Sequence, residues 1–149
     1  MILSYKQQFP WNQPTNFKRK IKDGDKKHTI RLDIHNRWKP GMKIHHAHGV
    51  RTPHYDCFLE NECISTQKIE VEEMAMISSD HCYVLEEYSE RLKETFFKIF
   101  RVAADDRTLT TEEIHTLAKN DGFDSTDDFF RWFSNNTEAK IIHWTDLKY

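Results

Sequence analysis

Three residues in the first third of the chain could carry chemistry together, namely Lys26, Thr29 and Arg31. A threonine hydroxyl becomes a nucleophile when a nearby base removes its proton, and a partly desolvated lysine with a lowered pKa can act as that base. Arg31 would offer a planar fork of N–H donors to a phosphate, or to a carbonyl oxygen on which negative charge develops. The three residue types therefore suit either hydrolysis of an acyl group or binding of a phosphate-bearing ligand.

The same residues also have an ordinary structural interpretation. Lys26 could be a solvated residue after a helix, and Thr29 could be a β-branched residue of a strand. Arg31 could form an ion pair with Asp33 or Asp121 at the rim of the fold. Residue types and spacing alone leave both interpretations open.

Aromatic and cationic side chains near this segment could stack on nucleic-acid bases. Trp11, Arg37 and Trp38 are the candidates, and each stacked base contributes about 1–3 kcal/mol. Trp38 precedes a Pro-Gly pair and could instead cap one end of the fold. His143 lies between apolar residues of the last expected strand, where lining a cleft and filling a core position are both open.

The histidines and cysteines do not predict a metal centre. His46 and His48 would share one face of a strand beside His45, but no carboxylate or cysteine stands at a supporting spacing. Zinc needs three or four convergent ligands. We therefore expect no metal and no cofactor, and we expect the three cysteines to be unreactive thiols.

Strands and short helices must position these residues. Because side chains alternate along a strand, Thr29 and Arg31 should share one face and Ile30 should pack inward. A helix over 15–23 should end at Gly24, since glycine readily takes the left-handed conformation. Strands are expected at 1–5, 27–32, 42–47, 64–76, 96–102 and 141–144.

Two further helices are expected in the last third of the chain. Thr110 and Glu113 have the spacing of a capping box, Gly122 ends that helix, and Ser125 caps the next one. Residues 78–94 are polar and should form an excursion between strands, with a helix around 86–93. Aromatic side chains should fill much of the core, with these candidates: Phe17, Phe96, Phe97, Phe100, Phe123, Phe129, Trp132 and Trp144.

Composition predicts one soluble domain. The chain has 149 residues and a net charge of −2, yet residues 17–43 hold ten Lys or Arg against three Asp. Such a local basic segment suits phosphate contacts. No run approaches the roughly twenty apolar residues that span a bilayer, and an odd cysteine count with no signal-like leader suggests reduced thiols. We therefore expect a cytoplasmic protein without a membrane partner.

The segment from Gly24 to Arg31 (GDKKHTIR) resembles the signature of the ASCH family, in which Gly-x-Lys is followed by four residues and then Arg. The expected helix before it and the turn from Trp38 to Gly41 after it agree with that pattern. AKNDGF at 118–123 and the last expected strand are similar to the closing elements of the family. The resemblance covers most of the chain and leaves out 78–94.

This resemblance implies an α+β fold similar to PUA domains, a small mixed β-barrel with short flanking helices and a cleft for RNA. The whole chain, 1–149, would be one such domain with an insertion near 78–94. Small bacterial members of the family hydrolyse N4-acetylcytidine with a lysine, a threonine three residues later and an acidic residue. Those positions correspond to Lys26, Thr29 and Asp121, where Asp121 replaces the longer glutamate of the enzymes.

Three functions remain in competition. The first is a module that binds RNA or a nucleoside in a basic cleft, and the second is an amidohydrolase acting on an acylated cytidine. The third is a protein-interaction domain that uses the acidic second half of the chain. The sequence does not predict the oligomeric state.

Overall fold

The computed structural model describes residues 1–75, 81–133 and 136–149. Over these residues the chain is an α+β fold made mostly of strands, which confirms the expected class. The first of two sheets has three strands in the order β1-β3-β4. Their bounds are Ile2–Ser4 for β1, Lys43–His48 for β3 and Asp56–Glu62 for β4.

The second sheet has six strands, with the order β2-β9-β5-β7-β6 and with β8 beside β7. Their bounds are His28–Arg31 for β2, Thr137–His143 for β9, Ser65–Met74 for β5, Glu94–Ala104 for β7, Tyr83–Ser89 for β6 and Arg107–Thr108 for β8. The chain passes from one sheet to the other between β4 and β5, where the Ile64 N–H donates to the His143 carbonyl across 2.8 Å. In the described part of the chain the two sheets do not close into a barrel.

Three short helices accompany the sheets, and local signals explain where they begin and end. They are α1 (Phe17–Lys22), α2 (Thr111–Asn120) and α3 (Thr126–Trp132). Thr110 and Glu113 form the predicted capping box at the start of α2, and the Ser125 hydroxyl caps α3. Gly24 and Gly122 follow α1 and α2 with φ of +81° and +87°, a conformation that favours glycine.

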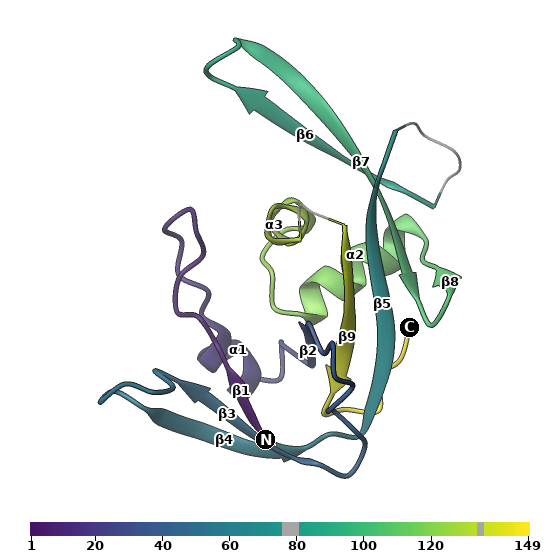
Figure 1. The fold of residues 1–149 in the computed structure, drawn as a ribbon. Helices are drawn as coiled ribbons and strands as arrows, with labels where there is room; N and C mark the ends of the chain where they lie inside the picture. Colours follow the sequence, from purple (N-terminus) through teal and green to yellow (C-terminus); the bar gives the residue numbers. More distant parts are fainter. Residues whose placement is uncertain (76–80, 134–135) are drawn as a thin grey trace.

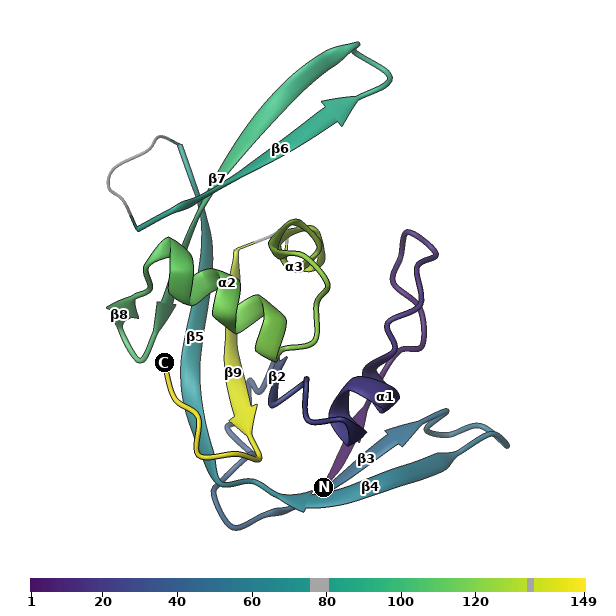
Figure 2. The same cartoon turned by 180° about the vertical axis from the view of Figure 1, so that it is seen from behind.

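The helices cover the sheets on different sides. Figures 1 and 2 show α2 running along the six-stranded sheet with α3 beside it, whereas α1 lies next to the three-stranded sheet. Phe17 of α1 meets the ring of Tyr5 edge-on at 6.1 Å, and Lys18 pairs with Asp56 of β4 at 2.6 Å. These contacts hold the segment that follows α1, which carries Lys26, between the two sheets.

Three expectations from the sequence are wrong. Residues 86–93 are not helical, because β6 and β7 form a hairpin that extends away from the rest of the molecule (Figure 1). Phe96 and Phe97 lie on this hairpin and are 41% and 64% exposed, so they do not belong to the core. Strand β4 was not expected at all. The parts of the expected insertion and strand that fall on residues 76–80 lie outside the described residues.

Candidate functional site

Lys26 lies in the interior and not at a solvated helix end. The residue is 1% exposed, and its N–H donates to the Lys20 carbonyl across 3.0 Å in the turn after α1. Its amine donates to the Asp121 carboxylate across 2.9 Å and also to the Asp121 backbone carbonyl. The amine is 4.7 Å from the centre of the Phe17 ring and 6.0 Å from that of Tyr5. Lys26 is therefore a buried, ion-paired lysine.

Gly122 gives the Lys26 side chain the room that it needs. A Cβ atom at Gly122 would come within 3.0 Å of Cδ of Lys26 and 3.2 Å of the Phe17 ring. These separations are shorter than ordinary carbon–carbon contacts of about 3.5–4.0 Å. The glycine that ends α2 thus also allows the lysine to reach Asp121.

The environment shifts the proton equilibrium of Lys26. Burial lowers the pKa of its amine from 10.5 to about 8, although the charge of Asp121 and its hydrogen bond act in the opposite direction. Desolvation disfavours the charged form of an amine, and a carboxylate partner favours it. A lysine with a pKa near 8 is partly neutral close to neutral pH and can then accept a proton. This is the property expected of a catalytic base.

Asp121 joins the end of α2 to the free edge of β2. One carboxylate oxygen accepts from the Lys26 amine, from the Ile30 N–H across 3.2 Å, and lies 3.5 Å from Nδ1 of His28. Burial alone would raise the pKa of this carboxyl, but Lys26 and His28 outweigh burial and leave the pKa below its usual value. The shorter aspartate therefore does reach the lysine.

Thr29 immediately precedes Ile30, the β2 residue whose N–H binds the Asp121 carboxylate. It is 1% exposed and lies opposite Ile142 of β9. Among the described residues, no hydrogen bond joins the Thr29 hydroxyl to Lys26 or Asp121. The structure thus brings Lys26 and Asp121 into contact and places Thr29 beside them without a direct bond.

Arg31 shares its strand face with Thr29 and reaches a different surface. Its guanidinium donates to the Ser4 carbonyl across 2.9 Å and to the Ile30 carbonyl across 3.3 Å, and lies 5.2 Å from the centre of the Tyr5 ring. It also lines a pocket of about 430 Å³. The other lining residues are Ile30, Leu32, Trp132, Phe133 and Thr137. A cation and two aromatic side chains therefore meet in one hollow.

Trp38 is buried, whereas the side chain of Arg37 is exposed and only its backbone N–H is held in place. Trp38 is 5% exposed and belongs to the hydrophobic core. The Asp33 carboxylate accepts from the Arg37 N–H across 2.9 Å and from the Trp38 N–H across 3.0 Å. Lys140 approaches the same carboxylate at 3.1 Å. A ring this deeply buried does not present a face to a base in this structure, so Trp38 occupies a core position.

Trp11 and His143 also differ in accessibility. Trp11 is half-buried and stacks on Phe9, with ring centres 4.8 Å apart. His143 is fully buried beside His28, at 5.3 Å between ring centres, and both of its ring nitrogens lack a hydrogen-bond partner among the described residues. Burial lowers the pKa of His143 to about 3. His143 thus occupies a core position in this structure.

Sequence reasoning missed Tyr5, as it missed His28 beside Asp121 and the pocket residues Trp132 and Phe133. The Tyr5 ring faces both Lys26 and Arg31, and its hydroxyl shares a hydrogen bond of 2.9 Å with Nδ1 of His46. Burial raises the pKa of the Tyr5 hydroxyl and keeps it protonated. Tyr5 extends β1 by one bond, from its N–H to the Ala47 carbonyl. The parallel pairing of β1 with β3 brings Tyr5 next to Lys26 and Arg31. No pattern of neighbouring residues in the sequence predicts that pairing.

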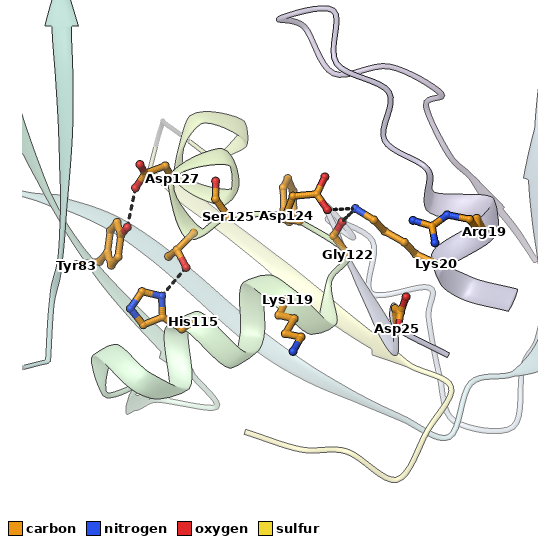
Figure 3. Close-up of a pocket in the computed structure, with 12 residues that line it drawn as sticks. Arg19, Lys20, Asp25, Tyr83, His115, Lys119, Gly122, Asp124, Ser125 and Asp127 are labelled. Atoms are coloured by element: carbon orange, nitrogen blue, oxygen red, sulfur yellow. Dashed lines mark hydrogen bonds and ion pairs between the residues drawn. The ribbon is translucent and has the colours of Figure 1, made fainter. Parts of the chain in front are cut away.

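A larger pocket of about 750 Å³ lies between α1, α2 and the start of α3 (Figure 3). One of its cations is paired: Lys20 contacts Asp124 at 2.7 Å and donates to the Gly122 carbonyl across 2.8 Å. His115 shares a hydrogen bond of 2.6 Å with Thr126 at the other end. Because its lining contains both basic residues (Arg19, Lys20, Lys119) and carboxylates (Asp25, Asp124, Asp127), this pocket has no strong preference for an anionic ligand.

Comparisons with protein families, with curated proteins and with solved structures found no match. Within the described residues, no helix has both the length and the apolar character needed to cross a membrane.

Proposed function

We propose that this chain is an ASCH-like domain that binds RNA or a nucleoside, with a base held between Arg31 and the aromatic side chains of Trp132 and Phe133. The observation that carries the proposal is the pocket of about 430 Å³ that these residues share. Ligand pockets typically have volumes of about 300–1,000 Å³, so this pocket suits one nucleoside. The PUA-like barrel and the cytoplasmic location implied by the sequence belong to the same proposal.

The chemistry of the pocket favours a base with a phosphate nearby. Indole and phenyl faces stack on any base. Arg31 uses two of its nitrogens on the Ser4 and Ile30 carbonyls, and a guanidinium has five N–H donors, so further donors are left for a phosphate. Basic residues before and after β2 would add favourable charge along a longer RNA.

Binding of labelled single-stranded RNA, followed by fluorescence anisotropy at low salt, tests this proposal. We expect affinity to fall as salt is added, because released counterions drive phosphate contacts. Arg31→Ala should weaken binding by about tenfold, the loss of one charge-assisted contact. Arg91→Ala, an exposed cation on the β6–β7 turn, is the matched control. Equal loss in both variants, or no binding of RNA or cytidine at low salt, contradicts the proposal.

A second function is favoured by the lowered pKa of Lys26. The neutral amine would take the Thr29 proton while Thr29 Oγ attacks the acetyl carbonyl of N4-acetylcytidine. The C–N bond then breaks, the proton goes to the leaving amine, and water later releases acetate from Thr29. Both residues are 1% exposed, so substrate would have to displace the covering side chains. This burial makes hydrolysis the second candidate.

Incubation of the protein with N4-acetylcytidine separates the two functions. Turnover that is lost in Lys26→Ala and Thr29→Ala, and kept in Thr66→Ala, would establish the hydrolase. Thr66 is the matched control because it lies in line with Thr29 across β9, opposite Ile142. If the protein binds cytidine but shows no turnover, the binding function is supported and hydrolysis is not.

A further inference from the structure

The outer face of the three-stranded sheet carries a cluster of metal-ligating side chains. His45 lies on β3, and Cys57 and Glu60 lie on β4; one ligand atom from each falls within 4.8 Å of the others. Nδ1 of His45 is 3.3 Å from Oε1 of Glu60. Cys57 is a free, exposed thiol. This cluster is separate from Lys26 and from the Arg31 pocket.

A β-bulge in strand β4 assembles the cluster. His45 pairs with Glu60 and His46 with Leu59, but Ala47 pairs with Cys57, so Phe58 is the extra residue. In a regular ladder Ala47 would oppose Phe58, and Cys57 would point to the other face. The bulge therefore brings the thiol onto the face of His45 and Glu60, while Phe58 packs against the rings of Tyr5 and His48.

We propose that His45, Cys57 and Glu60 form a Zn²⁺ site with an open fourth position. A thiolate, an imidazole and a carboxylate are the three ligand types that zinc accepts, at about 2.3, 2.0 and 2.0 Å. A tetrahedral ion with these bonds places its ligand atoms about 3.3–3.6 Å apart. The imidazole and carboxylate already have that separation. Rotation of the exposed Cys57 and Glu60 side chains would bring the thiol to the same separation from the other two ligand atoms. Three protein ligands leave one position for water or another small ligand.

The Lys43 amine competes with a metal ion for the Glu60 carboxylate. This amine lies 2.5 Å from Oε2 of Glu60, on the neighbouring position of the same sheet face. A bound Zn²⁺ must share the carboxylate with this cation or displace it, and two positive charges repel at this range. Lys43 thus lowers zinc affinity, and the part of this effect that depends on Glu60 reports whether Glu60 belongs to the site.

Titration of the reduced, metal-free protein with Zn²⁺ against a chromophoric chelator tests the site. We expect one ion per chain. Cys57→Ser and His45→Ala should each weaken binding by more than about tenfold, since even losses outside the ligand shell cost about 10–100-fold. Cys82→Ser is the matched control and should bind as the parent does. Co²⁺ should show tetrahedral absorption with a thiolate band that disappears in Cys57→Ser.

Lys43→Ala separates this site from simple binding to an exposed thiol. Removal of the competing amine should tighten zinc binding, and Glu60→Gln should abolish that gain. Unchanged stoichiometry and affinity in Cys57→Ser or His45→Ala would overturn the proposal. So would a Lys43→Ala variant whose zinc affinity equals that of the parent, because Glu60 would then lie outside the site.

Discussion

At the scale of single residues, the Lys26–Asp121 pair is a costly arrangement because both charged groups are buried. Both residues are at least 95% buried, and each charge has left water. Such a pair is retained only when the attraction and the hydrogen bonds offset desolvation. Here the carboxylate binds the Lys26 amine and the Ile30 N–H together, so it also holds the free edge of β2 at the end of α2.

We expect Asp121→Asn to lower the free energy of unfolding by about 3–5 kcal/mol, because it leaves the buried amine without a counter-charge. Adding Lys26→Met should recover part of the loss, since the double variant contains no unpaired charge. Urea unfolding at pH 7 measures both. Breaking the half-exposed pair of Arg101 and Glu72, joined at 2.9 Å, should cost at most about 1 kcal/mol. If the losses of unfolding free energy in Lys26→Met and Asp121→Asn simply add in the double variant, the two side chains are not coupled.

The buried histidines predict how stability depends on pH. Burial lowers the pKa of His46 to about 4 and that of His143 to about 3, from 6.5. Between pH 6.5 and 4 the unfolded chain therefore binds protons that the folded chain does not bind. Stability should fall as the pH drops through this window, by up to about 1.4 kcal/mol per pH unit for each histidine.

Urea unfolding between pH 7 and pH 4 measures this slope. His46→Gln and His143→Gln should flatten it, whereas His54→Gln, at an exposed position, should leave it unchanged. A parent protein whose unfolding free energy is constant from pH 6.5 to pH 4 would show that these imidazoles protonate without unfolding.

At the scale of elements, the two halves of strand β7 lie in different environments. Its second half is buried, with Phe100 stacked on Phe130 of α3 at 4.5 Å between ring centres. Among the residues that the structure describes, its first half pairs with β6 alone, where Phe97 lies opposite Glu86. The phenylalanines at 96, 97 and 100 look alike in sequence, but only Phe100 packs against a helix, whereas Phe96 and Phe97 are exposed.

Substitutions along β7 should therefore differ sharply. Phe100→Ala should cost about 3–5 kcal/mol, since it leaves a cavity beside Phe130. Phe97→Ser should change stability by less than about 0.5 kcal/mol, as at other exposed positions. Thermal unfolding of the two variants measures the difference. A large loss in Phe97→Ser would show that the hairpin packs against something.

At the scale of the whole molecule, one aromatic cluster joins the beginning of the chain to its last third. The ring of Phe9 meets Phe17 at 5.7 Å, Phe123 at 5.6 Å and Trp132 at 5.6 Å. The loop before α1 is thereby attached to the loop between α2 and α3 and to the last residue of α3. This cluster also supports Trp132 where it lines the proposed base pocket.

We expect Phe9→Ala to lower the free energy of unfolding by about 3–5 kcal/mol, because the ring is 3% exposed and contacts aromatic rings of α1, of α3 and of the loop between α2 and α3. Ile34→Ala is the matched control, since Ile34 is 87% exposed and should change stability by less than about 0.5 kcal/mol. Denaturant unfolding compares the two. Equal effects would mean that the first fifteen residues do not contribute to the core.

The sequence by itself determined the features that depend on neighbouring residues. Gly24, Gly122 and the caps at Thr110 and Ser125 were predicted because turn and helix-end chemistry acts over a few residues. The strand that carries Thr29 was predicted from β-branched residues and alternation. The placement of Lys26 near Asp121 came from resemblance, and the structure provides the contact.

Only the tertiary structure decided which side chains meet across strands. Tyr5 reaches Lys26 through a parallel pairing with β3, and Cys57 reaches His45 through a bulge in a strand that the sequence did not reveal. Whether an aromatic residue is buried, as for Phe100, or exposed, as for Phe97, depended on where the helices end. Contacts between residues far apart in sequence follow from the packing of whole elements, and a local sequence pattern does not determine that packing.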